Sequence, residues 1–474
     1  MLSYKIVSRL NKKGGGFLLE ETKQLGNEKV GRLLLKFSIP AVTGMLVNAL
    51  YSVVDRIFVG RGVGSVALSG VAVTFPITNV IMALGLLIGV GSAAVISIKL
   101  GQKKNEEAEQ ILGNAVILSI IIPIIFSILG LIFLEPILNI LGASAVTMPD
   151  AKKFASILLI GAVLQDIGFG LNPIIRSKGD PKTAMKTMLI GAALNFILNP
   201  IFIFVLKLGV TGSALATVIS QTVCTVWIFR YFTKKDNILR IKRKNLKLKK
   251  SLIKQIISIG LSPFALQISA SLVTIVINIS LEKYGGDPAI GAFSIINSIA
   301  VLIFMPMLGV NQGAQPIIGY NYGAGNMSRV KKAFKYGCIV NTIVGTIGFI
   351  IVQIFAGNII RVFNTTDADL ISIGTSGIRF FMLMYSVVGI QSACVNYFQA
   401  IGRAKYSIFF SVLRQIVILI PIMLILPHFL GLNGVWISAP ISDFISFVIT
   451  VIIAAREIKK LTDEPESKAT KSIA

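Results

Sequence analysis

Four charged side chains stand inside long runs of apolar residues. They are Asp55, Asp166, Arg414 and Asp443. A carboxylate at the centre of a hydrocarbon layer costs about 2.5–3.5 kcal/mol on insertion scales, so such a residue needs a partner or a task. Removal from water also favours the protonated form of a carboxyl. These carboxyls are therefore candidates for taking up H⁺ or another small cation.

Each of the four residues has more than one interpretation. Asp166 has no cation near it in the sequence, so we expect a buried, pH-sensitive carboxyl that faces a cavity. Asp55 is either an ion site or an interfacial residue that the adjacent Arg56 neutralises. Arg414 and Asp443 lie on consecutive antiparallel runs, which would allow a structural ion pair.

Amide and thioether side chains also lie within the apolar runs. A single buried amide often only bridges two helices, and methionine is common in apolar cores. As a set, these residues would line a polar cavity with adaptable apolar surface, which suits promiscuous binding. The candidates for this cavity are Asn48, Asn79, Met82, Gln165, Gln267, Asn278, Asn297, Met305, Gln391 and Asn396.

Pro40 precedes Asp55 in the same apolar run. Proline removes one backbone hydrogen bond and permits a kink. We therefore expect one helix to carry both a titratable group and a hinge. The alternative is that Pro40 only caps the start of that helix.

The composition predicts which elements position these residues. Of the 474 residues, 54% are hydrophobic and 14% are charged, whereas soluble chains carry about 25% charged residues. This excludes a soluble enzyme. Apolar runs of about 20 or more residues recur, and each is long enough to cross a hydrocarbon core of about 30 Å. The fold class is therefore an all-α polytopic membrane protein.

Twelve runs are predicted to span the membrane. They lie near residues 38–60, 66–98, 111–134, 154–176, 184–206, 210–232, 255–281, 288–319, 333–356, 371–399, 407–430 and 432–455. The fifth and sixth runs nearly fuse at residues 207–209, and the last two do so at 428–431. Both breaks predict tight hairpins at the membrane edge.

Basic residues outnumber acidic ones by 46 to 21, which gives a formal net charge of +25. Most of them fall in the tails and in alternate loops, as the positive-inside rule requires. We therefore expect a cytoplasmic-membrane protein with both termini cytoplasmic, in contact with membrane lipids and not with nucleic acid. The expected parts are a tail (1–36), an N-terminal six-helix lobe (37–232), a basic linker (233–254), a C-terminal six-helix lobe (255–456) and a second tail (457–474).

The two halves repeat each other. Gly91 and Gly313, and likewise Gly101 and Gly323, are separated by about 222 residues, and four further Gly or Pro pairs share nearly the same offset. Six spans per half give both copies the same orientation. Such copies would be related by an axis along the membrane normal, with a cavity between them near the midplane.

Several functions lack their motifs. No G-x-x-x-x-G-K-[ST] sequence occurs, so we expect no ATPase. The only histidine is His428, and the three cysteines form neither a disulfide framework nor a metal-binding spacing. The basic, Gly-rich N-terminus does not resemble a cleavable signal peptide. We expect no enzyme activity, cofactor or metal, which leaves ion-driven secondary transport or a lipid-linked flippase.

Several motifs in register resemble a known family. The first run reads Ile39-Pro40 and then Val54-Asp55-Arg56-Ile57-Phe58-Val59-Gly60. Further on come Ser177-Lys178-Gly179-Asp180-Pro181-Lys182, Leu194-Asn195-Phe196-Ile197-Leu198-Asn199-Pro200 and Gly319-Tyr320-Asn321-Tyr322-Gly323-Ala324-Gly325. From about residue 30 to 455 the chain resembles the multidrug and toxic compound extrusion (MATE) family, in its MepA- and DinF-like branch.

The resemblance implies two six-helix bundles in a V that export bulky organic cations in exchange for H⁺ or Na⁺. It implies that Asp55 takes up the coupling ion and that its helix bends near Pro40. This chain has Asn199 where relatives often have Asp, so the ion-coupling set becomes Asp55, Asp166, Asn195 and Asn199, with Asp166 as a possible substitute.

The family's carboxylates in the seventh and tenth spans are also missing. Asn278 occupies the repeat position of Asp55, and Glu282 lies at the helix end. Both features weaken a Na⁺ assignment.

The leading hypothesis is a monomeric multidrug antiporter for organic cations that works by alternating access. A flippase for lipid-linked saccharides is the alternative, but it should line its cavity with several basic residues, and Arg414 is the one clear case. A sensor or structural membrane protein would not need a duplicated polar interior.

Overall fold

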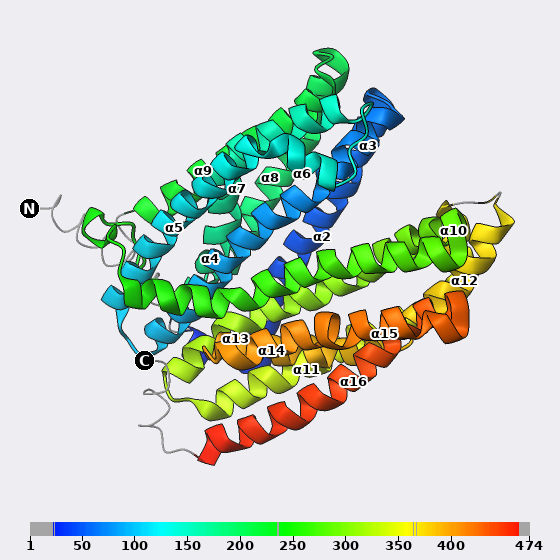
Figure 1. Cartoon of the computed structure of the whole chain (residues 1–474). Coiled ribbons are helices and arrows are strands. Elements are labelled where there is room, and N and C mark those ends of the chain that lie inside the picture. The colour runs from blue at the N-terminus through cyan, green and yellow to red at the C-terminus, as the bar shows by residue number, and fades with distance from the viewer. Residues whose placement is uncertain (1–21, 23, 235–236, 364, 366, 464–474) are drawn as a thin grey trace, which may run out of the picture.

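The computed structural model describes residues 22, 24–234, 237–363, 365 and 367–463. Its helices form two lobes that meet at the end where the described chain begins and diverge toward the opposite end, which gives a V (Figure 1). We call the first region the junction end and the second the splayed end. The predicted all-α, two-lobed fold is confirmed.

The N-terminal lobe contains the first half of the chain. Its elements are α2 (Val30–Gly62), α3 (Ser65–Val73), α4 (Phe75–Gly101), α5 (Asn105–Ile132), α6 (Leu134–Ile140), α7 (Met148–Lys178), α8 (Pro181–Pro200), the π-helix η1 (Ile201–Val205) and α9 (Gly209–Thr233). A linker with one short 3₁₀-helix, η2 (Arg243–Asn245), leads to the second lobe.

The C-terminal lobe repeats this plan with fewer interruptions. Its elements are α10 (Lys250–Gly323), α11 (Met327–Phe363), α12 (Ala368–Phe381), α13 (Tyr385–Ala400), α14 (Ala404–Val412), the π-helix η3 (Leu413–Leu419), α15 (Ile420–Ile425) and α16 (Pro427–Asp463).

The described helices agree with twelve spans. Ten helices are long and apolar enough to cross a membrane, and the pair α12 and α13, bent by 49°, adds an eleventh. The 74-residue α10 is two helices joined at Gly286, where φ is 63° and ψ is −165°. This non-helical residue lies between the runs predicted at 255–281 and 288–319. Counting α10 as two spans gives the twelve that the sequence predicts.

The turns show that the repeat is structural. Gly179 ends α7 in the left-handed conformation (φ 114°), and Gly402 does the same before α14 (φ 79°). Gly209 and Gly431 form a second equivalent pair, with φ values of 60° and 56°. Only glycine adopts such conformations at little cost. The constant offset therefore places the same chain reversal at the same point of each lobe.

Glycines also bring the lobes together at the junction end. A Cβ on Gly91 of α4 would overlap the Ile256 carbonyl oxygen of α10. Likewise, a Cβ on Gly313 of α10 would lie 2.7 Å from the backbone nitrogen of Ser38 in α2. The repeated pair Gly91 and Gly313 thus permits backbone-to-backbone contact between the lobes, because any larger residue would separate them.

A short segment before α2 bridges both lobes at the junction end. On the N-terminal lobe, the Thr22 hydroxyl donates to the Lys178 carbonyl oxygen at 3.1 Å. On the C-terminal lobe, the Arg329 guanidinium donates to the carbonyl oxygens of Leu25 (3.0 Å) and Glu28 (2.7 Å). The Leu25 side chain is fully buried. We call this segment, Thr22 with residues 24–28, the N-terminal strap.

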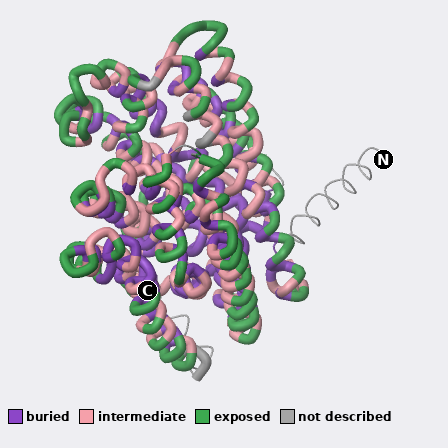
Figure 2. Tube along the Cα trace, turned by 90° about the vertical axis from the view of Figure 1, so that its right-hand side faces the viewer, coloured by how far each residue is buried: buried purple, intermediate pink, exposed green. Residues whose placement is uncertain are grey.

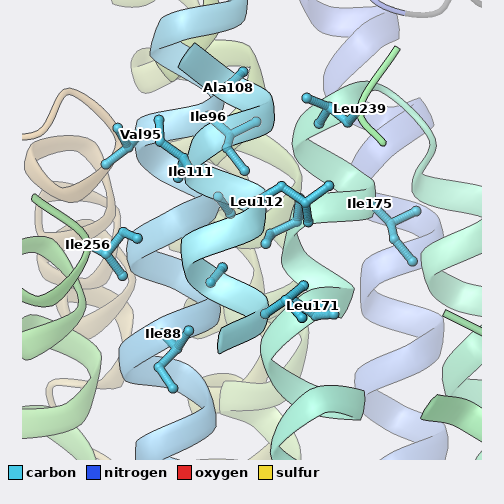
Figure 3. Packing of buried hydrophobic residues seen from close by; sticks show 14 of the residues in the cluster. Ile88, Val95, Ile96, Ala108, Ile111, Leu112, Leu171, Ile175, Leu239 and Ile256 are labelled. Atoms are coloured by element: carbon cyan, nitrogen blue, oxygen red, sulfur yellow. The ribbon is translucent and has the colours of Figure 1, made fainter. Parts of the chain in front are cut away.

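Apolar packing follows the same division. The largest buried cluster in the N-terminal lobe joins α4, α5 and α7 (Figure 3). It also includes Leu239 of the linker and Ile256 of α10, so the start of the second lobe is packed into the first. Buried residues lie mainly in the interior and exposed ones on the outer faces (Figure 2). The exposed residues include large apolar side chains such as Ile132 (66%) and Val226 (61%), as expected for helices that face lipid.

Candidate functional site: the Asp55 cluster

Three helices of the N-terminal lobe meet around Asp55. The carboxyl belongs to α2, which packs against α8, and α8 packs against α9. Asn195 and Asn199 lie four residues apart on α8, and Ser213 and Thr217 lie four residues apart on α9. Side chains with this spacing share one helix face. The helices α8 and α9 therefore each present a pair of polar groups toward the carboxyl of α2.

Hydrogen bonds connect these side chains. Asn199 Nδ2 donates to Asp55 Oδ1, and Ser213 Oγ donates to the same oxygen at 2.9 Å. Asn199 Nδ2 also lies 3.2 Å from Asn195 Oδ1, and Asn195 Nδ2 donates to Thr217 Oγ1 at 3.1 Å. We call these five residues the Asp55 cluster.

Tyr51, one turn before Asp55 on α2, adds a longer contact to the cluster. Its hydroxyl lies 3.5 Å from Thr217 Oγ1. Asn199 and Ser213 are fully buried, and Asn195 is 2% exposed. The cluster is therefore an internal feature of the lobe.

The chemistry of the cluster depends on its single carboxyl. The other members are neutral amides and hydroxyls, so the cluster is anionic when Asp55 is ionised and neutral when it is protonated. Asn199 Oδ1 is buried and has no hydrogen-bond partner among the described residues. The cluster thus offers carboxylate, amide and hydroxyl oxygens, which are suitable ligands for a proton or a hard cation such as Na⁺.

A proline shapes α8 at this point. Pro200 follows Asn199 and lacks the backbone N–H that would continue the helix ladder. The next five residues, Ile201–Val205, form the π-helix η1. Such π-helical turns are often found at functional sites.

Asp166 lies elsewhere in the same lobe. It is on α7, is 1% exposed, and neither carboxyl oxygen has a hydrogen-bond partner among the described residues. A Cβ on Gly85 of α4 would come within 3.0 Å of Asp166 Oδ1, so the carboxyl faces α4. The hydrogen bonds of the Asp55 cluster do not include it, and its role in ion coupling stays a prediction.

Pro40 lies inside α2, ten residues after the helix begins at Val30. The alternative that Pro40 caps the helix is therefore wrong. Residues 30–37 are more polar than the predicted run and lie outside it, but they are helical. The helix is continuous through the proline, so a hinge at Pro40 stays a prediction.

The ten candidate cavity residues differ in burial. Gln391 is 3% exposed, and both of its amide atoms lack partners among the described residues. Asn278 and Asn297, both on α10, are exposed. The remaining seven are partly buried: Asn48, Asn79, Met82, Gln165, Gln267, Met305 and Asn396. Met305 lies one turn before Gly309, which contacts α2, so the two residues share a helix face.

The structure brings Arg414 and Asp443 together, with Nε 2.6 Å from Oδ1. Sequence reasoning missed Ser213, Thr217 and Tyr51. The signal that could have found the two hydroxyls is their four-residue spacing in the sixth span, which matches that of Asn195 and Asn199 in the fifth. In the described part of the chain, no group of three or more His, Cys, Asp or Glu side chains could hold a metal ion.

Repeated lobes of membrane-spanning helices with a polar cluster inside one of them define a multi-pass membrane transporter. A family model described as MatE matches residues 40–201 and again residues 263–425. The chain therefore belongs to the MATE family of multidrug efflux transporters.

Individual relatives agree with this membership. The chain is 27% identical over 436 residues to the multidrug export protein MepA of Staphylococcus haemolyticus (strain JCSC1435), covering 92% of this chain and 96% of the relative. It is 28% identical over 424 residues to MepA of Staphylococcus aureus (strain MSSA476), covering 90% and 93%. A solved structure described as the outward-facing conformation of a multidrug resistance MATE family transporter superposes with a TM-score of 0.88 at 27% identity, covering 93% and 98%.

Proposed function

We propose that this protein exports organic cations in exchange for H⁺ or Na⁺, with Asp55 as the coupling residue. The observation that carries the proposal is the Asp55 cluster. It contains one partly buried carboxyl, which accepts hydrogen bonds from donors on two other helices. The chain that carries it belongs to a family of multidrug transporters. A change in the charge of Asp55 must therefore alter contacts among α2, α8 and α9.

The proposed orientation places both termini in the cytoplasm. The basic linker lies at the junction end, so the positive-inside rule assigns that end to the cytoplasm. The splayed end then faces outside, and the conformation is outward-facing. The likeness to a transporter structure described as outward-facing supports this assignment.

In the proposed cycle, ionised Asp55 attracts an organic cation. In the outward-facing state, a proton or Na⁺ from outside neutralises the carboxylate. The attraction is lost and the cation leaves. Rocking of the lobes then exposes the site to the cytoplasm, where the ion departs and a new substrate enters. Substrate and coupling ion compete for one charge, which couples their movements.

A lipid-linked flippase is not favoured. Both relatives are named for multidrug export, and the one charged group of the Asp55 cluster is a carboxyl. We propose a monomer as the working unit, with each chain containing both lobes.

The test is ethidium efflux from proteoliposomes under an imposed pH gradient and, separately, an imposed Na⁺ gradient. We expect one gradient to drive efflux in the wild type and Asp55→Asn to abolish it. Glu282→Gln is the matched control, because it removes an exposed carboxyl at the splayed end of α10, outside the cluster. Unchanged gradient-driven efflux in Asp55→Asn would overturn the proposal.

A further inference from the structure

The segments that precede the first helix of each lobe occupy equivalent places at the junction end. The N-terminal strap precedes α2, and the linker precedes α10. The repeat offset of 222 residues aligns Leu25 of the strap with Lys247 of the linker. The backbone carbonyl oxygens of these two residues both accept a hydrogen bond from an asparagine. Leu25 accepts from Asn321 Nδ2 at 2.9 Å, and Lys247 accepts from Asn114 Nδ2 at 3.2 Å.

The donors to the strap belong to the opposite lobe. Asn321 lies near the end of α10 and Arg329 near the start of α11, whereas the strap continues into α2 of the N-terminal lobe. Arg329 donates to the carbonyl oxygens of Leu25 and Glu28, at 3.0 and 2.7 Å. Its Nε donates to Asn321 Oδ1 at 2.9 Å, which orients the guanidinium. One cation thus holds two carbonyl oxygens of the strap, and hydrogen bonds from a charged donor are the stronger kind.

The linker is held in a corresponding way by α5 of the N-terminal lobe. Asn114 Oδ1 accepts from the backbone nitrogen of Lys249 at 2.8 Å. Lys242 Nζ lies 2.6 Å from Glu109 Oε2, and the Glu109 side chain is 6% exposed. The linker leads into α10, the first helix of the C-terminal lobe. Each segment therefore ties the first helix of one lobe to the third span of the other, which is α5 or α11.

The helix starts that follow the two segments are packed into the opposite lobe. Three buried apolar residues at the start of α2 belong to a cluster of the C-terminal lobe, and three at the start of α10 belong to the largest cluster of the N-terminal lobe. Each member of one set aligns with a member of the other at the offset of 222. The pairs are Val30 with Leu252, Leu34 with Ile256, and Phe37 with Ile259. Parting the lobes at the junction end must therefore disturb both sets.

We infer that the strap and the linker are a pair of crossed latches that hold the junction end closed. Each latch joins the two lobes, so its contacts resist their separation at that end. Weakening a latch therefore favours conformations in which the junction end is open. The inference goes beyond the proposed function, because it concerns the equilibrium between conformations and not the ion or the substrate.

A cysteine in place of Ser38 reports the opening of the junction end. Ser38 is 6% exposed, and a Cβ on Gly313 of the opposite lobe would lie 2.5 Å from its Oγ. It lies eight residues, or about 12 Å, into α2 from Val30, so departure of the strap alone does not uncover it. Its hydroxyl has no hydrogen-bond partner among the described residues, so Ser38→Cys loses none. The rate of its modification by a water-soluble maleimide is measured on the purified full-length protein in detergent, in a background without native cysteines.

Each latch has one substitution that weakens it and one matched control. Arg329→Gln removes the charged donor to the strap, and Lys331→Gln removes an exposed cation two residues further along α11. Glu109→Gln removes the carboxylate that binds Lys242, and Glu106→Gln removes an exposed carboxylate on α5. We expect Arg329→Gln and Glu109→Gln each to accelerate the modification by at least about tenfold, because each loses a hydrogen bond to a charged group. The two controls should keep the rate of the background.

An unchanged rate in either latch variant, with its fold judged by a melting curve, would overturn the inference. If a latch variant does not fold, a milder one takes its place. Arg329→Lys keeps the charge but loses the planar fork, and Lys242→Gln removes the other half of the linker pair. The same acceleration is expected of both, and an unchanged rate there would also refute the latches. Faster hydrogen exchange in the strap without faster modification at residue 38 would mean that the strap only anchors α2.

The measurement uses neither an ion gradient nor a substrate. Its result therefore does not depend on whether Asp55 couples transport. Failure of ethidium efflux would refute the proposed function and leave the latches standing, whereas an unchanged modification rate would refute the latches and leave the proposed function standing.

Discussion

Substituting Gly260 by Ala should open the junction end. A Cβ at Gly260 of α10 would overlap the Leu87 carbonyl oxygen of α4 and lie 2.6 Å from its carbonyl carbon. Ordinary carbon contacts are about 3.5–4.0 Å, so the two helices must separate by about 1 Å. The obstacle is backbone and cannot rotate away. Overpacking of this kind costs about 1–3 kcal/mol.

This cost applies to the closed junction and not to the helix itself, because alanine favours a helix over glycine by about 1 kcal/mol. A bias of 1–3 kcal/mol changes a two-state equilibrium by about 5- to 150-fold. Gly260→Ala should therefore reduce the population of the state described here in favour of states in which the junction end is open.

Spin labels report this change across the splayed end. Val146, before α7, and Val362, near the end of α11, are exposed by 67% and 82% and belong to different lobes. In a background without native cysteines, double electron–electron resonance should show one long distance in the wild type and a shorter population in Gly260→Ala. Gly337→Ala is the control, since nothing lies within 4 Å of its added Cβ. Identical distance distributions in the two variants would refute the reasoning.

Three further outcomes are expected. Arg329→Gln removes the donor that holds the N-terminal strap, so the Leu25 amide should exchange hydrogen faster, while Lys331→Gln on the exposed face of α11 should not change it. Asn199→Asp adds a second carboxyl beside Asp55, so a Na⁺ titration of ethidium efflux should show stronger stimulation than in the wild type. Ethidium binding to the wild type should weaken as pH falls, because protonation removes the negative charge of Asp55. Binding to Asp55→Asn should not change over the same pH range. The same pH dependence in both proteins would contradict this assignment.

The sequence predicts the fold well because the signals are strong and local. Each span is a long apolar run, and a run of that length in lipid must satisfy its own backbone hydrogen bonds as a helix. The offset of the glycines also predicts the repeat. The contact that some of them make between the lobes is not visible in the sequence, because a constant offset along the chain does not say which helices touch. The same limit applies to the strap.

The candidate site is only partly predictable for a related reason. Asp55, Asn195 and Asn199 stand out because amides and carboxyls are rare in apolar spans. Ser213 and Thr217 do not, since hydroxyls in helices usually bond to the carbonyl four residues earlier and need no other partner. Which faces of α2, α8 and α9 meet is determined by packing. Asp166 shows the consequence, because it is equally unusual in sequence but faces α4.

On the proposed function, the position of α2 would let one carboxyl in one lobe influence both. Near its start, α2 carries Ser38 and Val42, whose backbones contact Gly313 and Gly309 of the C-terminal lobe. Near its end, the same helix carries Asp55, which α8 and α9 hold by hydrogen bonds. On the proposed function, neutralising Asp55 would weaken the contact with α8 and α9 and so free one end of a helix whose other end is packed against the opposite lobe. Pro40 lies between Ser38 and Val42, where a missing backbone hydrogen bond makes bending least costly. On the proposed function, ion binding at Asp55 would therefore be felt at the junction between the lobes through α2, although the C-terminal lobe has no equivalent carboxyl at Asn278.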